Sequence, residues 1–419
     1  MEDTPSQGVG ERPLRVVMVI QRFRPYFSGQ GVQLEALARS LARSGVDVSI
    51  LTAVRGDEAP YEEAIDGYRI RRLRCDVVGA AQSRAWSPTF AVRAGAALWQ
   101  RRRDIDLVHV HGVNDALYTA WAFGRLWRIP VLFELTLTGA DDPDSVRRSK
   151  NRFSAIRYAI YRRMAGYVAI SPQLADAART AGIGDDRLWT IPQGVDLERF
   201  RPAPDRAAAR RALGIAGDGP LAVFVGSLIE RKGIDLLLAA WETVHRRMPQ
   251  AALALVGKDQ FGGDSDAERF LARSLGKLSP AAAGAVVRAG LRDDAERFLQ
   301  AADVFVFPSR REGFGSAIVE AMACGLPCVV ADLAGITDYI FPAPSEASGG
   351  VVVPQQDPEA VARAVTALLE DPDRASKLGD RARARAAACF GIDRVAQQYL
   401  SAYAAVVDAD VANRPDSSR

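Results

Sequence analysis

The sequence predicts an α/β protein made of two doubly wound domains that face each other. Its 419 residues exceed the usual size of one domain, and 48% of them are apolar, which is enough for two hydrophobic cores. Short apolar runs of strand length alternate with amphipathic helical patterns, as in parallel sheets with helices on both faces. Prolines and glycines cluster between residues 196 and 219, which indicates a linker between two such series.

The first series opens with a predicted strand at 14–20 and a helix at 32–44. The loop between them, QRFRPYFSGQG, places glycines at the amino end of the helix. Glycine allows backbone amides to approach an anion closely, so the loop is a candidate phosphate site. It lacks the G-x-G-x-x-G spacing of dinucleotide-binding folds, which disfavours a nicotinamide oxidoreductase.

A further predicted strand at 106–110 delivers His109 and His111 to its carboxyl end on one face. A metal site needs at least one more ligand, and the remaining histidine, His245, falls in a helical stretch of the second series. We therefore predict no metal site here. His111 is expected to face the cleft between the domains, or else to be hydrogen-bonded inside the edge of the sheet.

The stretch 147–164 is the most basic part of the chain, and it carries apolar residues at helical spacing: Phe153, Ile156, Ile160 and Met164. As a helix it has one apolar stripe flanked by arginines. The stripe can pack on the sheet, which leaves a solvated basic face. Alternatively, the helix can lie on an anionic membrane surface or meet the phosphates of an acceptor.

In the second series, a predicted strand at 221–225 runs into GSLIERKGIDLLLAAW. Arg231 and Lys232 stand in the loop before the next helix, at the carboxyl end of that strand. Cations so placed suit the neutralisation of a diphosphate group, although a solvated pair in a loop would show the same pattern.

The stretch PSRREGFGSAIVEAMACGLPCVV, 308–330, reads as a strand end, a loop, a helix, a tight turn and the next strand. Ser316 is the predicted N-cap of the helix, whose free N–H groups would point at an anion or a sugar. Glu312 precedes the helix, and Glu320 lies one turn into it on the same face as Ser316. Each carboxylate can accept hydrogen bonds from two hydroxyl groups of a sugar.

The composition disfavours several other classes of protein. A net charge of +3 is too small to indicate nucleic acid binding, and the four cysteines form no disulfide or metal pattern. The first dozen residues do not resemble a signal peptide, and no run of about 18 apolar residues could span a membrane. We expect a cytoplasmic protein in a reducing compartment, with a disordered tail at 413–419.

The stretch 308–330 resembles the signature of glycosyltransferase family 4, the large retaining group with the GT-B fold. The match comprises, in order, Pro308, Ser309, Glu312, Gly313, Phe314, Gly315, Glu320, Ala321, Gly325 and Pro327. The resemblance extends over nearly the whole chain and implies a GT-B architecture. It implies an acceptor-binding domain at 1–205, a nucleotide-sugar-binding domain at 206–390 and a helix at 391–412 that crosses back to the first domain.

The resemblance also implies which residues act on the donor. Glu312 would hold the sugar, Lys232 the diphosphate and Glu320 the ribose. Further donor contacts would come from two groups of residues: Gly29, Gln30, Gly226, Ser227, Gly290 and Leu291 toward the phosphates and base, and Gly313, Phe314, Gly315 and Ser316 toward the sugar.

Three positions depart from the family pattern. Ser28 replaces the first of two glycines, Ser227 replaces an arginine, and Thr136 replaces a histidine near the reacting carbon. Arg231 can restore the missing cation. Thr136 can donate a hydrogen bond but cannot carry a positive charge, and His111 is the other candidate for that catalytic role.

These observations predict a metal-independent hexosyltransferase that uses a UDP- or GDP-sugar and needs no cofactor. Its acceptor would be a glycan, a lipid-linked molecule or a small molecule, in surface polysaccharide or glycolipid synthesis. Contact of the basic stretch 147–164 with the inner face of the cell membrane is the alternative to a helix packed on the sheet with a solvated basic face. Two alternatives stay open: a GT-B protein that binds a nucleotide sugar without transferring it, and a nucleotide-sugar epimerase.

Overall fold

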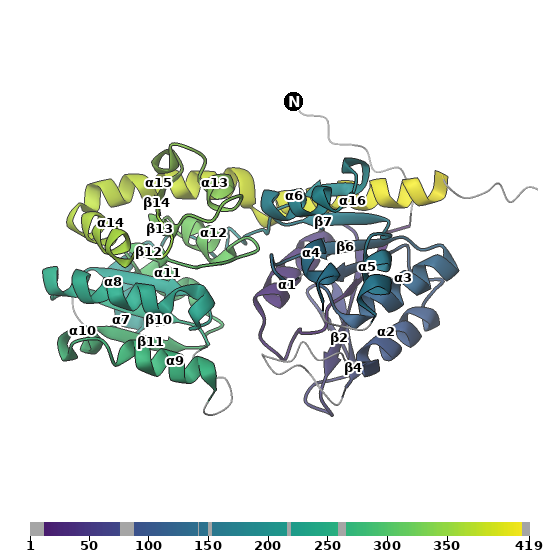
Figure 1. Ribbon diagram of the computed structural model, residues 1–419, viewed down its shortest axis with the longest axis horizontal. Coiled ribbons are helices and arrows are strands. Elements are labelled where there is room, and N and C mark those ends of the chain that lie inside the picture. Colours follow the sequence, from purple (N-terminus) through teal and green to yellow (C-terminus); the bar gives the residue numbers. More distant parts are fainter. Residues whose placement is uncertain are drawn as a thin grey trace, which may run out of the picture.

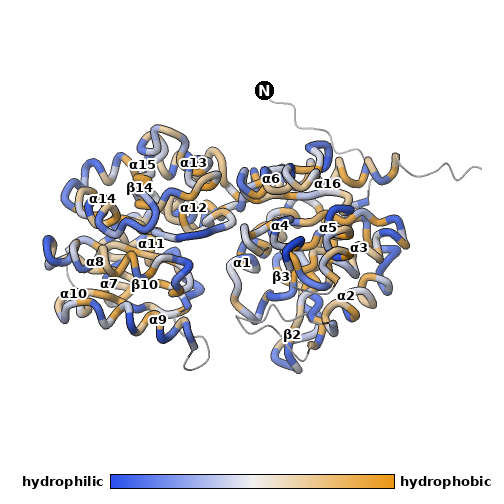
Figure 2. The backbone as a smooth tube through the Cα atoms, viewed as in Figure 1, coloured by the Kyte–Doolittle hydropathy of each residue, from blue (hydrophilic) through white to orange (hydrophobic). Residues whose placement is uncertain are grey.

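The computed structural model describes residues 12–75, 88–140, 142–149, 153–215, 219–258 and 265–412, so the predicted tail at 413–419 lies outside the described residues. The described chain forms two α/β domains that lie side by side, each around its own sheet (Figure 1). The predicted fold class is confirmed. Apolar and polar residues alternate along many of the outer helices, as expected of helices with one buried face (Figure 2).

The first sheet has eight strands in the order β3-β4-β2-β1-β5-β6-β7-β8. All neighbouring strands are parallel except the β3–β4 hairpin. The strands are β1 (Arg15–Val19), β2 (Asp47–Val54), β3 (Glu62–Ile65), β4 (Tyr68–Arg74), β5 (Leu107–His111), β6 (Val131–Leu135), β7 (Gly166–Ala169) and β8 (Leu188–Thr190). The helices are α1 (Gly29–Arg43), α2 (Pro88–Gln100), α3 (Asp115–Trp127), α4 (Pro143–Arg147), α5 (Ser154–Tyr161) and α6 (Pro172–Thr180).

The second sheet has six parallel strands in the order β11-β10-β9-β12-β13-β14. The strands are β9 (Leu221–Val225), β10 (Ala252–Val256), β11 (Val286–Gly290), β12 (Val304–Phe307), β13 (Cys328–Ala331) and β14 (Gly350–Val353). The helices are α7 (Arg206–Ala212), α8 (Ile234–Arg247), α9 (Asp266–Leu275), α10 (Pro280–Gly284), α11 (Ala295–Ala301), α12 (Ser316–Ala323), α13 (Thr337–Ile340), α14 (Pro358–Glu370) and α15 (Pro372–Phe390). The strand order reverses between β9 and β12, and ligands of such sheets bind outside the carboxyl ends of the strands at that point.

Two segments of chain join the domains, and they are hydrogen-bonded to each other. The Val195 amide donates to the Phe390 carbonyl at 2.8 Å, and the Ile392 amide donates to the Val195 carbonyl at 2.9 Å. The last helix, α16 (Ile392–Ala412), then packs against α1 of the first domain. The carboxylate of Asp393 accepts hydrogen bonds from Ser40 at 2.6 Å and Arg43 at 2.7 Å, which holds the beginning of α16 on α1.

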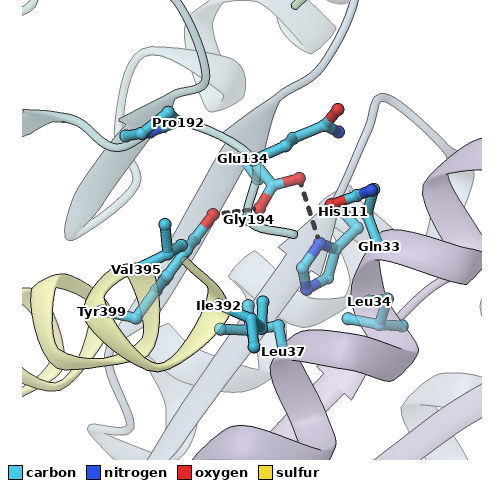
Figure 3. Close-up of a pocket in the computed structure, with 11 residues that line it drawn as sticks. Gln33, Leu34, Leu37, His111, Glu134, Pro192, Gly194, Ile392, Val395 and Tyr399 are labelled. Carbon is cyan, nitrogen blue, oxygen red and sulfur yellow. Dashed lines mark hydrogen bonds and ion pairs between the residues drawn. The ribbon is translucent and has the colours of Figure 1, made fainter. Parts of the chain in front are cut away.

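Two tyrosines of α16 reach a buried polar cluster at the ends of β5 and β6. The Tyr399 hydroxyl donates to Glu134 Oε2 at 2.6 Å (Figure 3), and the Tyr403 hydroxyl lies 2.9 Å from His109 Nδ1. Burial, and then the neighbouring imidazole of His111, hold the pKa of His109 well below its usual range. The cluster therefore joins the last helix to the first sheet through polar contacts that water does not reach.

The basic stretch 147–164 does not form the single helix that the sequence predicts. Asp142 caps α4 by accepting the Ser145 amide at 3.0 Å, and a separate helix, α5, begins at Ser154. The apolar stripe is also divided, because Phe153 and Ile156 are 51% and 60% exposed whereas Met164 is buried. Only the end of the stripe therefore packs into the domain.

Replacing Tyr399 with Phe should destabilise the first domain, because the buried Glu134 loses its hydroxyl donor. We expect Tyr399→Phe to lower the free energy of unfolding by about 1–3 kcal/mol in a denaturant titration. Tyr158→Phe is the matched control, since Tyr158 stacks on Tyr161 through its ring. Equal stability of both variants and the native chain would contradict a structural role for this contact.

Candidate active site at the strand switch point

The loops after β9 and β12 lie side by side because these strands are neighbours in the second sheet. The Arg310 amide donates to the Arg231 carbonyl at 2.9 Å, and the Ser309 hydroxyl oxygen lies 3.2 Å from the same carbonyl oxygen. Arg310 also forms a bidentate ion pair with Asp235 of α8, in which Nη1 lies 2.8 Å from Oδ1 and Nη2 lies 2.7 Å from Oδ2. These contacts fix the two loops against each other at the carboxyl edge of the sheet.

Gly233 sets the position of Lys232 in this arrangement. Its φ of +71° is a left-handed conformation, and an added Cβ would lie 1.9 Å from the Pro308 carbonyl oxygen, so a side chain cannot be accommodated. The close approach places Lys232 Nζ 4.9 Å from the centre of the Phe307 ring. Lys232 therefore lies over the end of β12.

Lys232 and Glu312 form a buried ion pair at the centre of the site. Lys232 Nζ lies 2.7 Å from Glu312 Oε1, and Arg231 contacts the same oxygen at 3.4 Å. The Ser309 hydroxyl donates to Oε1 as well, at 2.6 Å. Among the contacts of the described residues, all those to this carboxylate fall on Oε1, so Oε2 has no protein donor.

The charges of the pair depend on each other because Glu312 is only 6% exposed. Burial opposes ionisation of Glu312, but the positive charges of Lys232 and Arg231 outweigh it and lower the pKa of the carboxyl group. Burial likewise lowers the pKa of Lys232, against the attraction of Glu312. The charged form of each group is therefore stabilised by the other at the sheet edge.

The amino end of α12 differs from the prediction. Gly315, with φ of +94°, occupies the cap position, and Ser316 is the first residue of the helix rather than its N-cap. The Ser316 hydroxyl bonds instead to the Gln193 side chain, in the segment that leads out of the first domain. Sequence pattern favoured serine as the cap, whereas the sharp turn requires the left-handed conformation that glycine adopts most readily.

Glu320 lies one turn further along α12 and is half-buried. No hydrogen bond or ion pair to its carboxylate occurs among the described residues. Burial raises the pKa of Glu320 to about 7, although the Arg199 cation opposes the shift. The carboxylate is thus an acceptor that gains its full charge only above neutral pH or when donors bind it.

The loop before α12 also touches the first domain. A Cβ added at Gly313 would lie 1.9 Å from the Thr136 carbonyl oxygen, and one added at Gly139 would lie 2.5 Å from the Arg311 guanidinium. The structure thus brings the loop before α12 and Thr136 together.

His111 belongs to the buried cluster and also lines a pocket bordered by α1, the segment 192–194 and α16 (Figure 3). Its side chain is almost fully buried, and its Nδ1 lies 3.3 Å from Glu134 Oε1 (Figure 3). This is the second of the two positions expected from sequence, a histidine held inside the sheet edge. The catalytic role of His111 stays a prediction.

The expectation that no third metal ligand accompanies the two histidines is wrong. Glu134 comes from the neighbouring strand, and ligand atoms of His109, His111 and Glu134 all lie within 4.8 Å of one another. The pairing of β5 with β6 produces this group, which spacing along the sequence does not reveal. Tyr399 and Tyr403 already bind Glu134 and His109, so we interpret the group as a hydrogen-bonded anchor for α16.

The remaining predicted residues lie at the carboxyl edges of both sheets. Gly29 and Gln30 form the first turn of α1, where Ser28 caps the helix by accepting the Gly31 amide at 2.9 Å. Gly226 and Ser227 follow β9, and Gly290 ends β11 with Leu291 48% exposed beside it. The Phe314 side chain, 1% exposed, packs on Phe390, so only its backbone is available to a ligand.

Sequence reasoning assigned no role to three residues that shape the site: Ser309, Asp235 and Gln193. Ser309 binds Glu312, Asp235 holds Arg310, and Gln193 binds Ser316. Ser309 belongs to the motif of the stretch 308–330. Its position three residues before Glu312 could have indicated that the two side chains are in contact. No sequence signal marks the other two, because their partners lie far away along the chain.

Comparison with known proteins covers both domains. Residues 205–385 match the family described as Glycosyl transferases group 1, and residues 27–199 match Glycosyltransferase Family 4. The D-inositol 3-phosphate glycosyltransferase of Kineococcus radiotolerans is 30% identical over 415 residues, 92% of each chain. That of Nocardia farcinica is 30% identical over 97% of this chain and 92% of its own length.

Solved structures show the same fold. Sucrose-phosphate synthase from Thermosynechococcus elongatus has a TM-score of 0.76 at 24% identity and covers 94% of this chain and 100% of its own. HepE of Anabaena in complex with UDP-glucose has a TM-score of 0.73 at 19% identity, over 93% and 99%. The chain therefore belongs to glycosyltransferase family 4, the glycosyl transferases group 1, and has the GT-B fold.

Proposed function

We propose that this glycosyltransferase moves a hexosyl group from a nucleotide sugar to an acceptor hydroxyl group with retention of anomeric configuration. The observation that carries the proposal is the buried cluster of Lys232, Arg231 and Glu312 at the strand switch point. A diphosphate at this edge would meet two cations, and the sugar attached to it would meet the glycine-rich loop before α12.

The reaction breaks the bond between the anomeric carbon and the phosphate oxygen, and the nucleoside diphosphate leaves with the electron pair. A new bond forms between that carbon and the acceptor oxygen. The acceptor's proton passes to the departing phosphate oxygen on the same face. Because negative charge grows on the diphosphate, Lys232 and Arg231 supply the largest stabilisation, and no metal ion is required.

Glu320 is proposed to hold the ribose of the donor. Its carboxylate can accept hydrogen bonds and has no hydrogen-bonding partner among the described residues. The two neighbouring hydroxyl groups of a ribose could each donate a hydrogen bond to it. Gly290 and Leu291 would line the base. UDP is the favoured nucleotide, since HepE structures contain UDP or UDP-glucose, and GDP is the alternative.

The acceptor is proposed to be a glycan, a lipid-linked molecule or a small polyol phosphate. Relatives named D-inositol 3-phosphate glycosyltransferase support the last of these. None of the described helices is long and apolar enough to cross a membrane. The exposed Phe153 and Ile156 beside Arg147 and Arg148 support peripheral contact with an anionic membrane and a role in surface polysaccharide or glycolipid synthesis.

The alternative is a protein that binds a nucleotide sugar but has no transferase activity. It rests on Ser28, Ser227 and Thr136, which replace residues that the family pattern has for phosphate binding and catalysis. An epimerase would convert the donor in the absence of acceptor. Product analysis of labelled donor separates the three: transfer needs acceptor, epimerisation does not, and a binding protein returns the donor unchanged.

A thermal-shift and calorimetric screen of UDP, GDP, ADP and their common sugars is expected to identify one nucleoside diphosphate that binds saturably. Addition of a chelator should leave binding unchanged, because the fixed cations neutralise the diphosphate. Binding that requires a divalent ion would contradict the metal-independent proposal. Binding of none of them would contradict both the proposed transferase and the alternative that binds a nucleotide sugar without transferring it.

Lys232→Ala and Glu320→Ala should each lower turnover at least ~100-fold, the scale of losing one electrostatic contact in the transition state. Lys277→Ala is the matched control, because Lys277 is exposed on the same domain. Steady-state transfer of labelled sugar measures the effect. Near-native turnover in a folded Lys232→Ala or Glu320→Ala protein would remove that residue from the proposed site.

Donor affinity should rise with pH across neutrality. Glu320 has a raised pKa of about 7, so its charge is present above that pH, and ribose hydroxyls bind the charged carboxylate more strongly. We expect affinity for the nucleotide sugar to increase about tenfold between about pH 6 and about pH 8. Glu320→Gln should bind more weakly and lose this dependence; an unchanged pH profile would assign the titration to another group.

A further inference from the structure

A basic depression lies on the first domain, away from the candidate active site of the second domain. It has a volume of about 560 Å³ and is lined by Trp121, Arg125, Arg163 and Arg187. Arg163 precedes β7 and Arg187 precedes β8, whereas Trp121 and Arg125 lie in the last turns of α3, which leads into β6. The depression thus faces the amino ends of the strands, whereas Thr136 and His111 lie at their carboxyl ends.

No described carboxylate forms an ion pair with the three arginines of the depression. No acidic side chain is among the described residues that line it. Arg187 is held in place by backbone carbonyls, donating to Met164 at 3.2 Å and Arg162 at 3.4 Å, and its guanidinium lies 5.5 Å from the centre of the Tyr167 ring. These contacts orient the guanidinium but leave its charge unbalanced.

Neighbouring arginines behave differently. Arg157 of α5 pairs with Asp115 at 3.2 Å, and Arg179 of α6 pairs with Asp176 at 2.8 Å and Asp185 at 2.7 Å. For Arg125 and Arg163, no carboxylate partner occurs among the described residues. What distinguishes Arg125, Arg163 and Arg187 is that all three line one depression.

We propose that the depression binds a phosphate group carried by a larger molecule. Guanidinium groups present planar pairs of donors that match phosphate oxygens, and three of them can surround one phosphate group. The volume lies in the range of small-molecule sites and exceeds what a lone phosphate fills. The Trp121 indole adds an aromatic surface, and its buried Nε1 has no hydrogen-bond partner.

Two sources carry this chemistry, a phospholipid headgroup and a soluble phosphate ester. Leu126, 68% exposed next to Arg125, would enter the headgroup region of a bilayer if the source is a lipid. The site does not depend on the proposed transfer reaction, because none of its residues belongs to the candidate active site.

The test compares the native full chain with Arg125→Gln/Arg163→Gln and with Arg246→Gln/Arg273→Gln. The second pair changes the net charge equally on the other domain, so it controls for general electrostatic attraction. Arg187 is left intact because it binds backbone carbonyls. Binding is measured by co-flotation with phosphatidylcholine vesicles with and without phosphatidylglycerol, and by calorimetry with glycerol 3-phosphate.

The native chain and the control pair should bind a phosphate-bearing probe, and Arg125→Gln/Arg163→Gln should bind at least about tenfold more weakly, or about 1.4 kcal/mol. A loss confined to phosphatidylglycerol vesicles identifies a lipid headgroup. A loss confined to glycerol 3-phosphate identifies a soluble ester. Absence of native binding to both probes, or equal loss in the control pair, overturns the proposal, whatever the outcome for transferase activity.

Discussion

The ion pair between Lys232 and Glu312 is the interaction on which the candidate active site depends. A carboxylate and an ammonium group removed from water are costly separately, and loss of one partner leaves a buried charge that costs about 3–5 kcal/mol. The pair is possible because β9 and β12 are neighbours and Gly233 lets their loops touch. In return, the lysine charge is already desolvated and oriented at the edge where a diphosphate would arrive.

The second constraint is the connection between domains. The strand-like segment at Val195 and the chain leaving α15 are hydrogen-bonded to each other, and α16 continues onto the first domain. Tyr399 and Tyr403 anchor that helix in the cluster of His109, His111 and Glu134. The same region contributes Gln193, which binds Ser316 at the start of α12. The connection and the loop before α12 are therefore joined by a hydrogen bond. A movement of one domain relative to the other would strain or break this bond.

Charge is distributed unevenly over a chain whose net charge is only +3. Most arginines are balanced by nearby carboxylates, as Arg310 is by Asp235. Positive charge remains concentrated at the strand switch point, where it faces Glu312, and at the depression around Arg187, where no lining carboxylate faces it.

The sequence by itself determined the two α/β domains, the strands and helices of the stretch 308–330 and the identity of Arg231, Lys232, Glu312 and Glu320 as candidate residues. Hydrophobic periodicity, the positions of glycines and the order of motif residues are local properties of the chain. They can therefore be recognised without the three-dimensional structure. Tertiary structure alone decided that Ser309 binds Glu312, that Gly315 rather than Ser316 caps α12, and that His111 is buried against Glu134. It also limited the helix of the basic stretch to α5, Ser154–Tyr161, with Arg147 at the end of α4. These features depend on which strands are neighbours and on how closely backbones approach, and strand order is not encoded in the spacing of residues along the chain.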